Sequence, residues 1–478
     1  MSPNMSRHNF QIGHDMAATK GDPQVTGALW LETALLPEGW ADRVRLRHVA
    51  GRITAIETGV DPDADDERGG IGLPGLPNIH SHAFQRGMAG LAETRGRPDD
   101  DFWSWREVMY RFVDRLDPDD MEAIAALAFA EMLESGFTRV GEFHYLHHDL
   151  DGRPYADPAE LSARIAQAAS VTGIGLTLLP VFYAHSGFGG AEPKPGQRRF
   201  INNPDSFARV VEDAREACAI LPDPVVGVAP HSLRAVTPEQ LAIVTRIAPK
   251  APVHIHVAEQ VREVEDCLAW CGRRPVEWLL DEAGADGRWC LVHATHLTDA
   301  ETTGMAASGA VAGLCTITEA NLGDGIFPAA AYAAAGGAFA VGSDSNVLIS
   351  AAEELRTLEY AQRLSRRARN VLAGDAQGST GRALFDGALA GGARALGVAK
   401  AGLAVGAGLD VVTLDPAHAS LVGRKEDALL DGWIFAGRAG VVDGVWRYGR
   451  KVVGNGVHVS ADAITARYRR VLGKVLAL

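Results

Sequence analysis

The chain has 478 residues, of which 47% are hydrophobic and 22% are charged, and its formal net charge at pH 7 is −14. This acidic balance argues against a nucleic-acid partner, which favours a basic face, and no run approaches the roughly 18 apolar residues that a membrane span needs. The five cysteines indicate no disulfide framework and fit a reducing cytoplasm. We therefore expect a cytoplasmic globular protein of ordinary composition, long enough for more than one domain.

Both ends of the chain have the pattern of short β-strands. Residues 1–24 lack an apolar core, and we expect a mobile tail there. Alternating segments such as "VRLRHV" and "RITAIET" follow in residues 25–73, and similar segments with glycine turns return in residues 400–478. We predict one small β-sandwich-like accessory domain assembled from these two segments, with a helix at its C-terminal end.

Residues 74–399 alternate between apolar β-type runs and helical patterns. In the clearest helical pattern, "DPDDMEAIAALAFAEMLESG", Asp119 or Asp120 is the expected cap and Gly136 the expected end. Eight strands that alternate with helices predict an α/β fold, a (β/α)₈ TIM-like barrel. A doubly wound sheet is the alternative, but no glycine-rich phosphate motif follows the first strand.

Histidines and a carboxylate gather at the ends of the predicted strands. The first strand offers His80 and His82, the fifth offers His254 and His256, and the eighth offers Asp344. Residues two apart on a strand point to the same face, and the strand ends of a barrel converge. A lone histidine is usually a hydrogen-bonded core or loop residue, but separate strand ends that all carry metal-type ligands predict a metal site.

The segments "GLPNIHSHAFQRG", "HIHVAEQ", "LVHATH" and "VGSDS" resemble the amidohydrolase superfamily, and the resemblance covers nearly the whole chain. It implies the metal ligands His80, His82, His256 and Asp344, with His254 turned into packing. It also implies one divalent ion per chain, because strand four ends in "VAPHSLR" without the lysine that bridges two metals in binuclear members. Zinc is the expected ion, with Fe²⁺ as the alternative.

The same resemblance assigns the catalytic groups. Glu259, three residues after His256, is implied to take a proton from a metal-activated water and to pass it to the leaving nitrogen, aided by Asp344. His293 resembles the family histidine that stabilises the tetrahedral state. The alternative for Glu259 is a first-turn carboxylate that complements a helix dipole.

Longer motifs, including "FWSWREVMYRF", "GEFHYLHHDLDG", "HSLRAVTPEQ" and "TEANLGDGIFPA", resemble the formimidoylglutamate deiminases of that superfamily. The resemblance implies hydrolysis of N-formimino-L-glutamate to N-formyl-L-glutamate and ammonia, a step of histidine degradation. Arginine forks suit such a small dianionic substrate because they bind carboxylates in a bidentate manner, although surface salt bridges are the usual role of arginine. The implied substrate-binding residues are Gln85, Arg106, Tyr145, His231 and Arg234.

Two other hypotheses use the same residues. A mononuclear aminohydrolase of another amidine or of an aminated heterocycle such as guanine would share the metal ligands, although the arginines do not suit a neutral purine. A catalytically dead metal-binding or scaffolding protein would be expected to lack Glu259 or a ligand, and all are present. The family further implies a homodimer. Asn346 stands where relatives often have histidine, and we expect a local effect on that loop.

Overall fold

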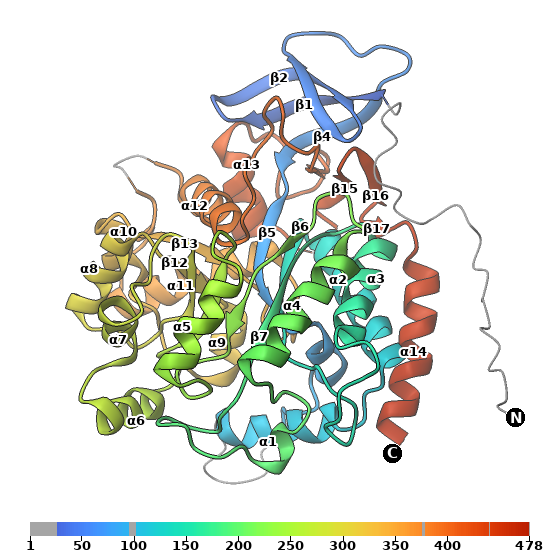
Figure 1. Ribbon diagram of the computed structural model, residues 1–478. Coiled ribbons are helices and arrows are strands. Elements are labelled where there is room, and N and C mark those ends of the chain that lie inside the picture. Colours follow the sequence, from blue (N-terminus) through green and yellow to red (C-terminus); the bar gives the residue numbers. More distant parts are fainter. Residues whose placement is uncertain (1–25, 95–101, 375–377, 439, 478) are drawn as a thin grey trace, which may run out of the picture.

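The computed structural model describes residues 26–94, 102–374, 378–438 and 440–477 (Figure 1). The predicted mobile tail, residues 1–24, lies outside these ranges. Within them, no helix is long and apolar enough to cross a membrane.

Parallel strands form the centre of the molecule. In chain order they are β5 (Leu76–Ser81), β6 (Phe137–His144), β7 (Gly175–Phe182), β8 (Val225–Val226), β9 (Ala229–Pro230), β10 (Val253–Val257), β11 (Trp289–His293), β12 (Val311–Leu314) and β13 (Ala338–Val341). Ladders join β5 to β8 and β10 to β13, and β9 pairs with β7, so β8 and β9 share the fourth strand position. Single parallel bridges, including Val228 with Val253 and Ser81 with Asp344, connect the two sheets. The predicted (β/α)₈ fold is confirmed, with its ring closed by these bridges instead of full ladders.

Helices surround these strands and connect them. They are α1 (Phe102–Val113), α2 (Pro118–Ser135), α3 (Glu160–Thr172), α4 (Pro204–Cys218), α5 (Pro238–Ile247), α6 (Val261–Cys271), α7 (Pro275–Asp281), α8 (Asp299–Ser308), α9 (Thr316–Leu322), α10 (Ala329–Ala334), α11 (Ala351–Arg366) and α12 (Thr380–Ala395). Short helical turns are η1 (Ala83–Met88) and η2 (Pro195–Gln197). Figure 1 shows α1 at the end of the barrel opposite β1 and β2.

The cap of α2 differs from the prediction of Asp119 or Asp120. Asp117 is the N-cap residue: its carboxylate accepts the N–H of Asp120, and the Asp120 carboxylate accepts the N–H of Asp117. Pro118 occupies the first helical position, where its missing N–H costs nothing. Asp119 and Asp120 therefore lie in the first turn, where carboxylates complement the helix dipole. Gly136, with φ of 106°, ends the helix as predicted.

The two ends of the chain combine in one eight-stranded sheet, as their β patterns predict. The N-terminal end supplies β1 (Thr26–Leu36), β2 (Gly39–Val49), β3 (Arg52–Glu57) and β4 (Glu67–Pro74), and the C-terminal end supplies β14 (Val411–Leu414), β15 (Val442–Arg447), β16 (Arg450–Gly454) and β17 (Val457–His458). The strand order is β17-β16-β15-β14-β4-β1-β2-β3, so β4 joins the two halves before the chain enters β5. The sheet packs around a core of its own that includes Leu31, Leu46 and Trp446.

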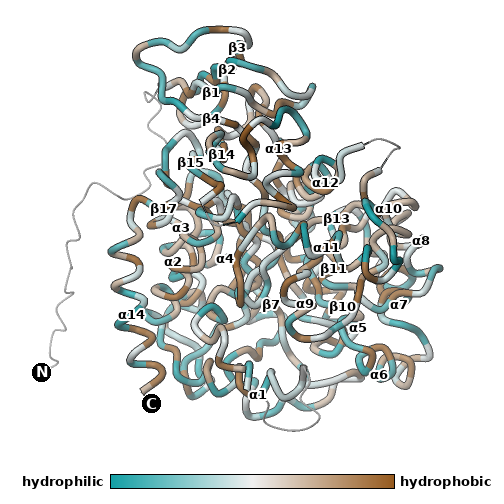
Figure 2. Tube along the Cα trace, turned by 180° about the vertical axis from the view of Figure 1, so that it is seen from behind, coloured by the Kyte–Doolittle hydropathy of each residue, from teal (hydrophilic) through white to brown (hydrophobic). Residues whose placement is uncertain are grey.

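The remaining elements of the C-terminal segment are α13 (Asp427–Asp431), η3 (Gly432–Ala436) and α14 (Ala461–Ala477). Helix α14 contacts α2 along the flank of the barrel. Figure 2 shows hydrophobic and hydrophilic stretches alternating along α14, a pattern typical of a helix with one buried face. The predicted domain boundaries near residues 74 and 400 stay a prediction.

A buried ion network fastens the sheet to the barrel. The side chain of Arg447 on β15 is 2% exposed, and its guanidinium contacts Asp410 at 3.0 Å and Asp223 more closely. Its Nε donates to the carbonyl oxygen of Thr138, and Arg139 on β6 also pairs with Asp223. The two arginines are buried and the two carboxylates are partly exposed, and the four groups neutralise one another.

Replacing Arg447 by methionine should lower the free energy of unfolding by about 3–5 kcal/mol, because both carboxylates lose a buried partner. Urea titration followed by circular dichroism measures this change. The matched control is Arg43→Met: Arg43 pairs with Asp61 at the surface, and such pairs contribute about 0–1 kcal/mol. Equal losses in the two variants would contradict a stabilising role for the network.

Candidate metal and active site

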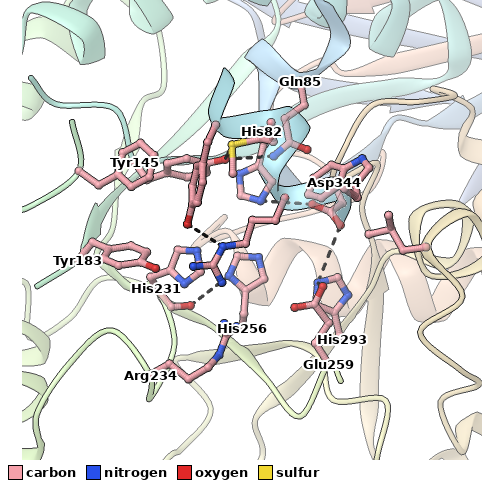
Figure 3. A pocket seen from close by; sticks show the side chains of 16 residues that line it. His82, Gln85, Tyr145, Tyr183, His231, Arg234, His256, Glu259, His293 and Asp344 are labelled. Atoms are coloured by element: carbon pink, nitrogen blue, oxygen red, sulfur yellow. Dashed lines mark hydrogen bonds and ion pairs between the residues drawn. The ribbon is translucent and has the colours of Figure 1, made fainter. Parts of the chain in front are cut away.

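The carboxyl ends of the barrel strands surround one cavity, which encloses about 580 Å³ including its opening (Figure 3). Ten of the eleven predicted site residues line it: His82, Gln85, Arg106, Tyr145, His231, Arg234, His256, Glu259, His293 and Asp344. The eleventh, His80, is fully buried beside His82. The structure thus brings the predicted ligands and the predicted substrate-binding residues to one place.

The four predicted metal ligands point their donor atoms at one another. His80 Nε2 lies 3.3 Å from His82 Nε2 and 3.0 Å from His256 Nε2. Asp344 Oδ1 lies 3.3 Å from His82 Nε2 and 3.6 Å from His80 Nε2. All four donor atoms lie within 4.8 Å of one another, so a single ion could contact each of them.

The protonation of the imidazoles makes this cluster suitable for a cation. His82 Nδ1 lies 3.0 Å from the carbonyl oxygen of Phe143, and His256 Nδ1 lies 3.1 Å from that of His231. A carbonyl only accepts, so each Nδ1 carries the proton and each Nε2 presents a lone pair. Burial lowers the pKa of His82 to about 3 and those of His80 and His256 well below their usual value. Neutral imidazoles with converging lone pairs fit a divalent metal, and carbonyl partners orient metal-binding histidines in this way.

His254 lies on the same face of β10 as His256, because the two residues are two apart, but further from the carboxyl end of the strand. Its Nε2 lies 2.7 Å from the carbonyl oxygen of Ala395, away from the cavity. Its position along the strand, and not a change of face, keeps His254 out of the metal cluster. It agrees with the expectation that His254 turns into packing.

Asn346 ties the first and last barrel strands together at the ligands. Its Nδ2 donates to Ser81 Oγ, to the carbonyl oxygen of His82 and to that of Asp344, at 3.0–3.1 Å. Asp344 and Asn346 have φ values of 44° and 54°, a conformation that non-glycine residues adopt at a cost. These hydrogen bonds hold the strained turn in place, and this is the local effect that we expect of Asn346.

Burial raises the pKa of the Asp344 carboxyl to about 7 in the protein without a metal. A cation placed among the four donors would lower this pKa again, because it favours the charged carboxylate. Metal binding and deprotonation of Asp344 are therefore coupled.

Glu259 and His293 face each other beside the cluster. Glu259 Oε1 lies 3.8 Å from His293 Nε2, and Asp344 Oδ2 lies 3.9 Å from the same nitrogen. Glu259 precedes Gln260, the N-cap residue of α6, so it lies outside the first helical turn and the helix-dipole alternative does not hold. Its carboxylate is buried and directed at the cavity (Figure 3).

Glu319 on α9 holds His293, and sequence reasoning did not identify this role. Its Oε1 lies 3.3 Å from His293 Nδ1. Burial lowers the pKa of His293, but the carboxylates of Glu259, Glu319 and Asp344 outweigh burial and raise this pKa to about 10. In the protein without a metal His293 therefore favours its protonated form, which can stabilise negative charge. The segment "TEANLGDGIFPA" carried a family resemblance, but nothing in it indicated a contact with strand six.

The cavity has two guanidinium groups near its mouth. Arg234 is 9% exposed, its Nη2 lies 3.9 Å from Glu263 Oε2, and its buried Nε has no hydrogen-bond partner among the described residues. Arg106 donates from Nε to the hydroxyl of Tyr110 at 2.6 Å, and it forms no ion pair within the ranges that the structure describes. These placements disfavour surface salt bridges and leave donors available to an anion.

The opposite wall offers neutral polar groups. Gln85 Nε2 donates to the Tyr145 hydroxyl at 3.1 Å. Gln85 Oε1 is buried and accepts no hydrogen bond from the described part of the chain. His231 packs against the ring of Tyr183, with centroids 4.6 Å apart. Tyr183 also lines the cavity and was not predicted from the sequence. An N–H of a bound molecule would satisfy Gln85 Oε1.

Comparison with known proteins extends these observations. The amidohydrolase family matches residues 71–452, and the N-terminal domain of the formimidoylglutamate deiminase HutF matches residues 27–70. The chain is 53% identical over 451 residues to a formimidoylglutamate deiminase from Pseudomonas aeruginosa, an alignment that covers 94% of this chain and 99% of that protein.

Solved structures show the same relationship. The crystal structure of an amidohydrolase from Brucella melitensis matches with a TM-score of 0.92 and 58% identity, covering 94% of this chain and 100% of that one. An adenosine deaminase from Xanthomonas campestris with bound zinc matches with a TM-score of 0.77 over 94% and 98% of the two chains, and at 21% identity it bears on the fold alone. The chain therefore belongs to the amidohydrolase family and, within it, to the formimidoylglutamate deiminases.

Proposed function

We propose that this protein hydrolyses N-formimino-L-glutamate to N-formyl-L-glutamate and ammonia. The observation that carries the proposal is the presence of two arginine side chains and a metal-type cluster in one cavity. The identity of 53% to a formimidoylglutamate deiminase supports it. The substrate has one amidine end for the cluster and two carboxylates for the arginines.

In this proposal His80, His82, His256 and Asp344 hold one divalent ion per chain. Three imidazoles and a carboxylate suit zinc, with Fe²⁺ as the alternative. When bound, such an ion acts as a Lewis acid and lowers the pKa of a water ligand to about 7.

The substrate is held at both ends. Arg106 and Arg234 bind its carboxylates, since their donors face the cavity and lack an acidic partner closer than 3.9 Å among the described residues. Gln85 accepts a hydrogen bond from the formimino N–H through its free Oε1. Tyr145 fixes the Gln85 amide, and His231 lines the wall between the two ends.

The chemistry needs a base, a proton donor and a stabiliser of negative charge. Glu259, aided by Asp344, takes a proton from the attacking water, whose oxygen bonds to the formimino carbon. His293, held protonated by its carboxylate neighbours, stabilises the tetrahedral state. Glu259 then delivers its proton to the terminal nitrogen. The proton left on the added hydroxyl passes by way of Asp344 to the same nitrogen, the carbonyl of the formyl group forms, the bond between carbon and nitrogen breaks, and ammonia leaves.

The compartment, oligomeric state and domain organisation of the enzyme can also be proposed. We infer a cytoplasmic homodimer that acts in histidine degradation, with a barrel domain at residues 74–399 and an accessory domain from residues 25–73 and 400–478. A guanine aminohydrolase is less well supported, because a neutral purine leaves the guanidinium groups of Arg106 and Arg234 without a partner.

The substrate panel tests the proposed function. Purified protein should release ammonia from formimino-glutamate, and its kcat/KM for formimino-glycine should be lower by about 30-fold or more, because a missing carboxylate leaves a buried guanidinium unpaired at about 2–5 kcal/mol. Guanine should give no ammonia. Preference for guanine, or equal rates on the two formimino compounds, would contradict the proposal.

The role of Glu259 is tested by Glu259→Gln. This substitution keeps the shape of the side chain and removes the base, so kcat should fall by about 10²- to 10⁴-fold. Metal content, measured by elemental analysis of the same sample, should stay at the wild-type level. The control is Glu265→Gln, at an exposed position of α6, which should keep wild-type turnover. Near-normal kcat in Glu259→Gln would exclude this residue as the base.

A further inference from the structure

A second cavity continues outward from the candidate site. It shares Arg106, Tyr110 and Arg234 with the inner cavity, and it encloses about 1640 Å³ including its wide opening. Its walls come from α1, from the segment of residues 186–196 and from α6. A ligand that enters the inner cavity by this side passes these walls first.

The outer cavity has a charge opposite to that of the whole chain. Four cationic side chains line it, Arg106, Lys194, Arg234 and Arg262, against the two carboxylates of Glu107 and Asp266. The chain as a whole carries a formal charge of −14. A local excess of positive charge in an acidic protein concentrates anions at that point of the surface.

Three of these cations are arranged around one aromatic ring. The Cζ atoms of Arg262, Arg106 and Arg234 lie 5.0, 5.4 and 5.7 Å from the ring centroid of Trp103. Contact with the negative face of an indole offsets part of the repulsion between neighbouring guanidinium groups. Trp103 therefore allows three like charges to stay close together.

The three guanidinium groups differ in their exposure. The Arg262 side chain is 65% exposed, that of Arg106 is half-buried, and that of Arg234 is 9% exposed. They form a series from solvent to the inner cavity. The acidic contact of Arg262 is Asp266, at 3.8 Å and itself 52% exposed, and such a pair contributes little. An incoming carboxylate can replace it.

We propose that the outer cavity is a capture site for the anionic substrate, with Arg262 as its outermost carboxylate-binding group. Arg262 binds a carboxylate first, and Arg106 and Arg234 receive it as the substrate moves inward. This inference rests on the proposed function, because it takes the substrate to be a dianion. Arg262 is a positioning residue in this account and does not contact the reacting atoms.

The test is the ionic-strength dependence of kcat/KM in Arg262→Glu. At low salt the variant should lose about tenfold in kcat/KM for formimino-glutamate while kcat stays unchanged. The loss should shrink near 1 M salt, where the screening length is about 3 Å. The loss in kcat/KM should also be smaller for the monoanion formimino-glycine than for the dianion formimino-glutamate. A structural defect would lower kcat/KM for both substrates alike. Arg262→Gln should show an intermediate loss.

The matched control is Arg246→Glu. Arg246 is exposed on α5 and lines neither cavity, and its replacement changes the net charge by the same amount. It should alter kcat/KM by less than about twofold, since steering depends on where the charge lies. If the wild type is active and its kcat/KM depends on salt in the same way as that of Arg262→Glu, the capture site is overturned. Absence of ammonia release from formimino-glutamate by the wild type would instead overturn the proposed function.

Discussion

Three imidazole Nε2 atoms and one carboxylate face one another at the carboxyl end of the barrel, and this constraint governs the rest of the site. Nε2 of His80 lies 3.0–3.3 Å from those of His82 and His256, and a cation between these nitrogens would remove the repulsion of lone pairs directed at one another. Burial keeps the rings neutral, and backbone carbonyls fix the tautomers of His82 and His256. The strained turn at Asp344 is held by Asn346 for the same purpose, because it brings the carboxylate toward the imidazoles.

The charges around this cluster are arranged by depth. Neutral ligands lie deepest, the carboxylate of Glu259 and the imidazolium of His293 lie beside them, and the guanidinium groups lie toward solvent. This order matches a substrate whose reacting end is an amidine and whose other end carries carboxylates. The barrel makes it possible, since strand ends supply the deep groups while α1 and α6 supply the outer ones.

The metal cluster and the barrel could be predicted from the sequence because both depend on short-range rules. Alternation along a strand places His80 and His82 on one face, and parallel strands end at the same edge, where His82 and His256 meet. The β patterns at the two ends likewise predicted their joint sheet. The substrate-binding residues came from family resemblance and not from such rules.

Other features depend on contacts that no local pattern contains. Glu319 reaches His293 from 26 residues away, and Asn346 reaches Ser81 across the closure of the ring. The shared contact of three arginines with Trp103 depends on how α1 lies over the barrel mouth. The cap of α2 was missed for a simpler reason, since three aspartates near its start could each serve and only the reciprocal bonds select Asp117.

Metal stoichiometry tests the central claim most directly. Elemental analysis should find one divalent ion per chain in active wild-type protein. The same substitution, histidine to glutamine, is made at position 256, whose ring reaches His80, and at position 254, whose ring contacts the Ala395 carbonyl. His256→Gln should lose the ion and the activity, and His254→Gln should keep the ion. Active protein without metal, or a full complement of metal in His256→Gln, would contradict the account.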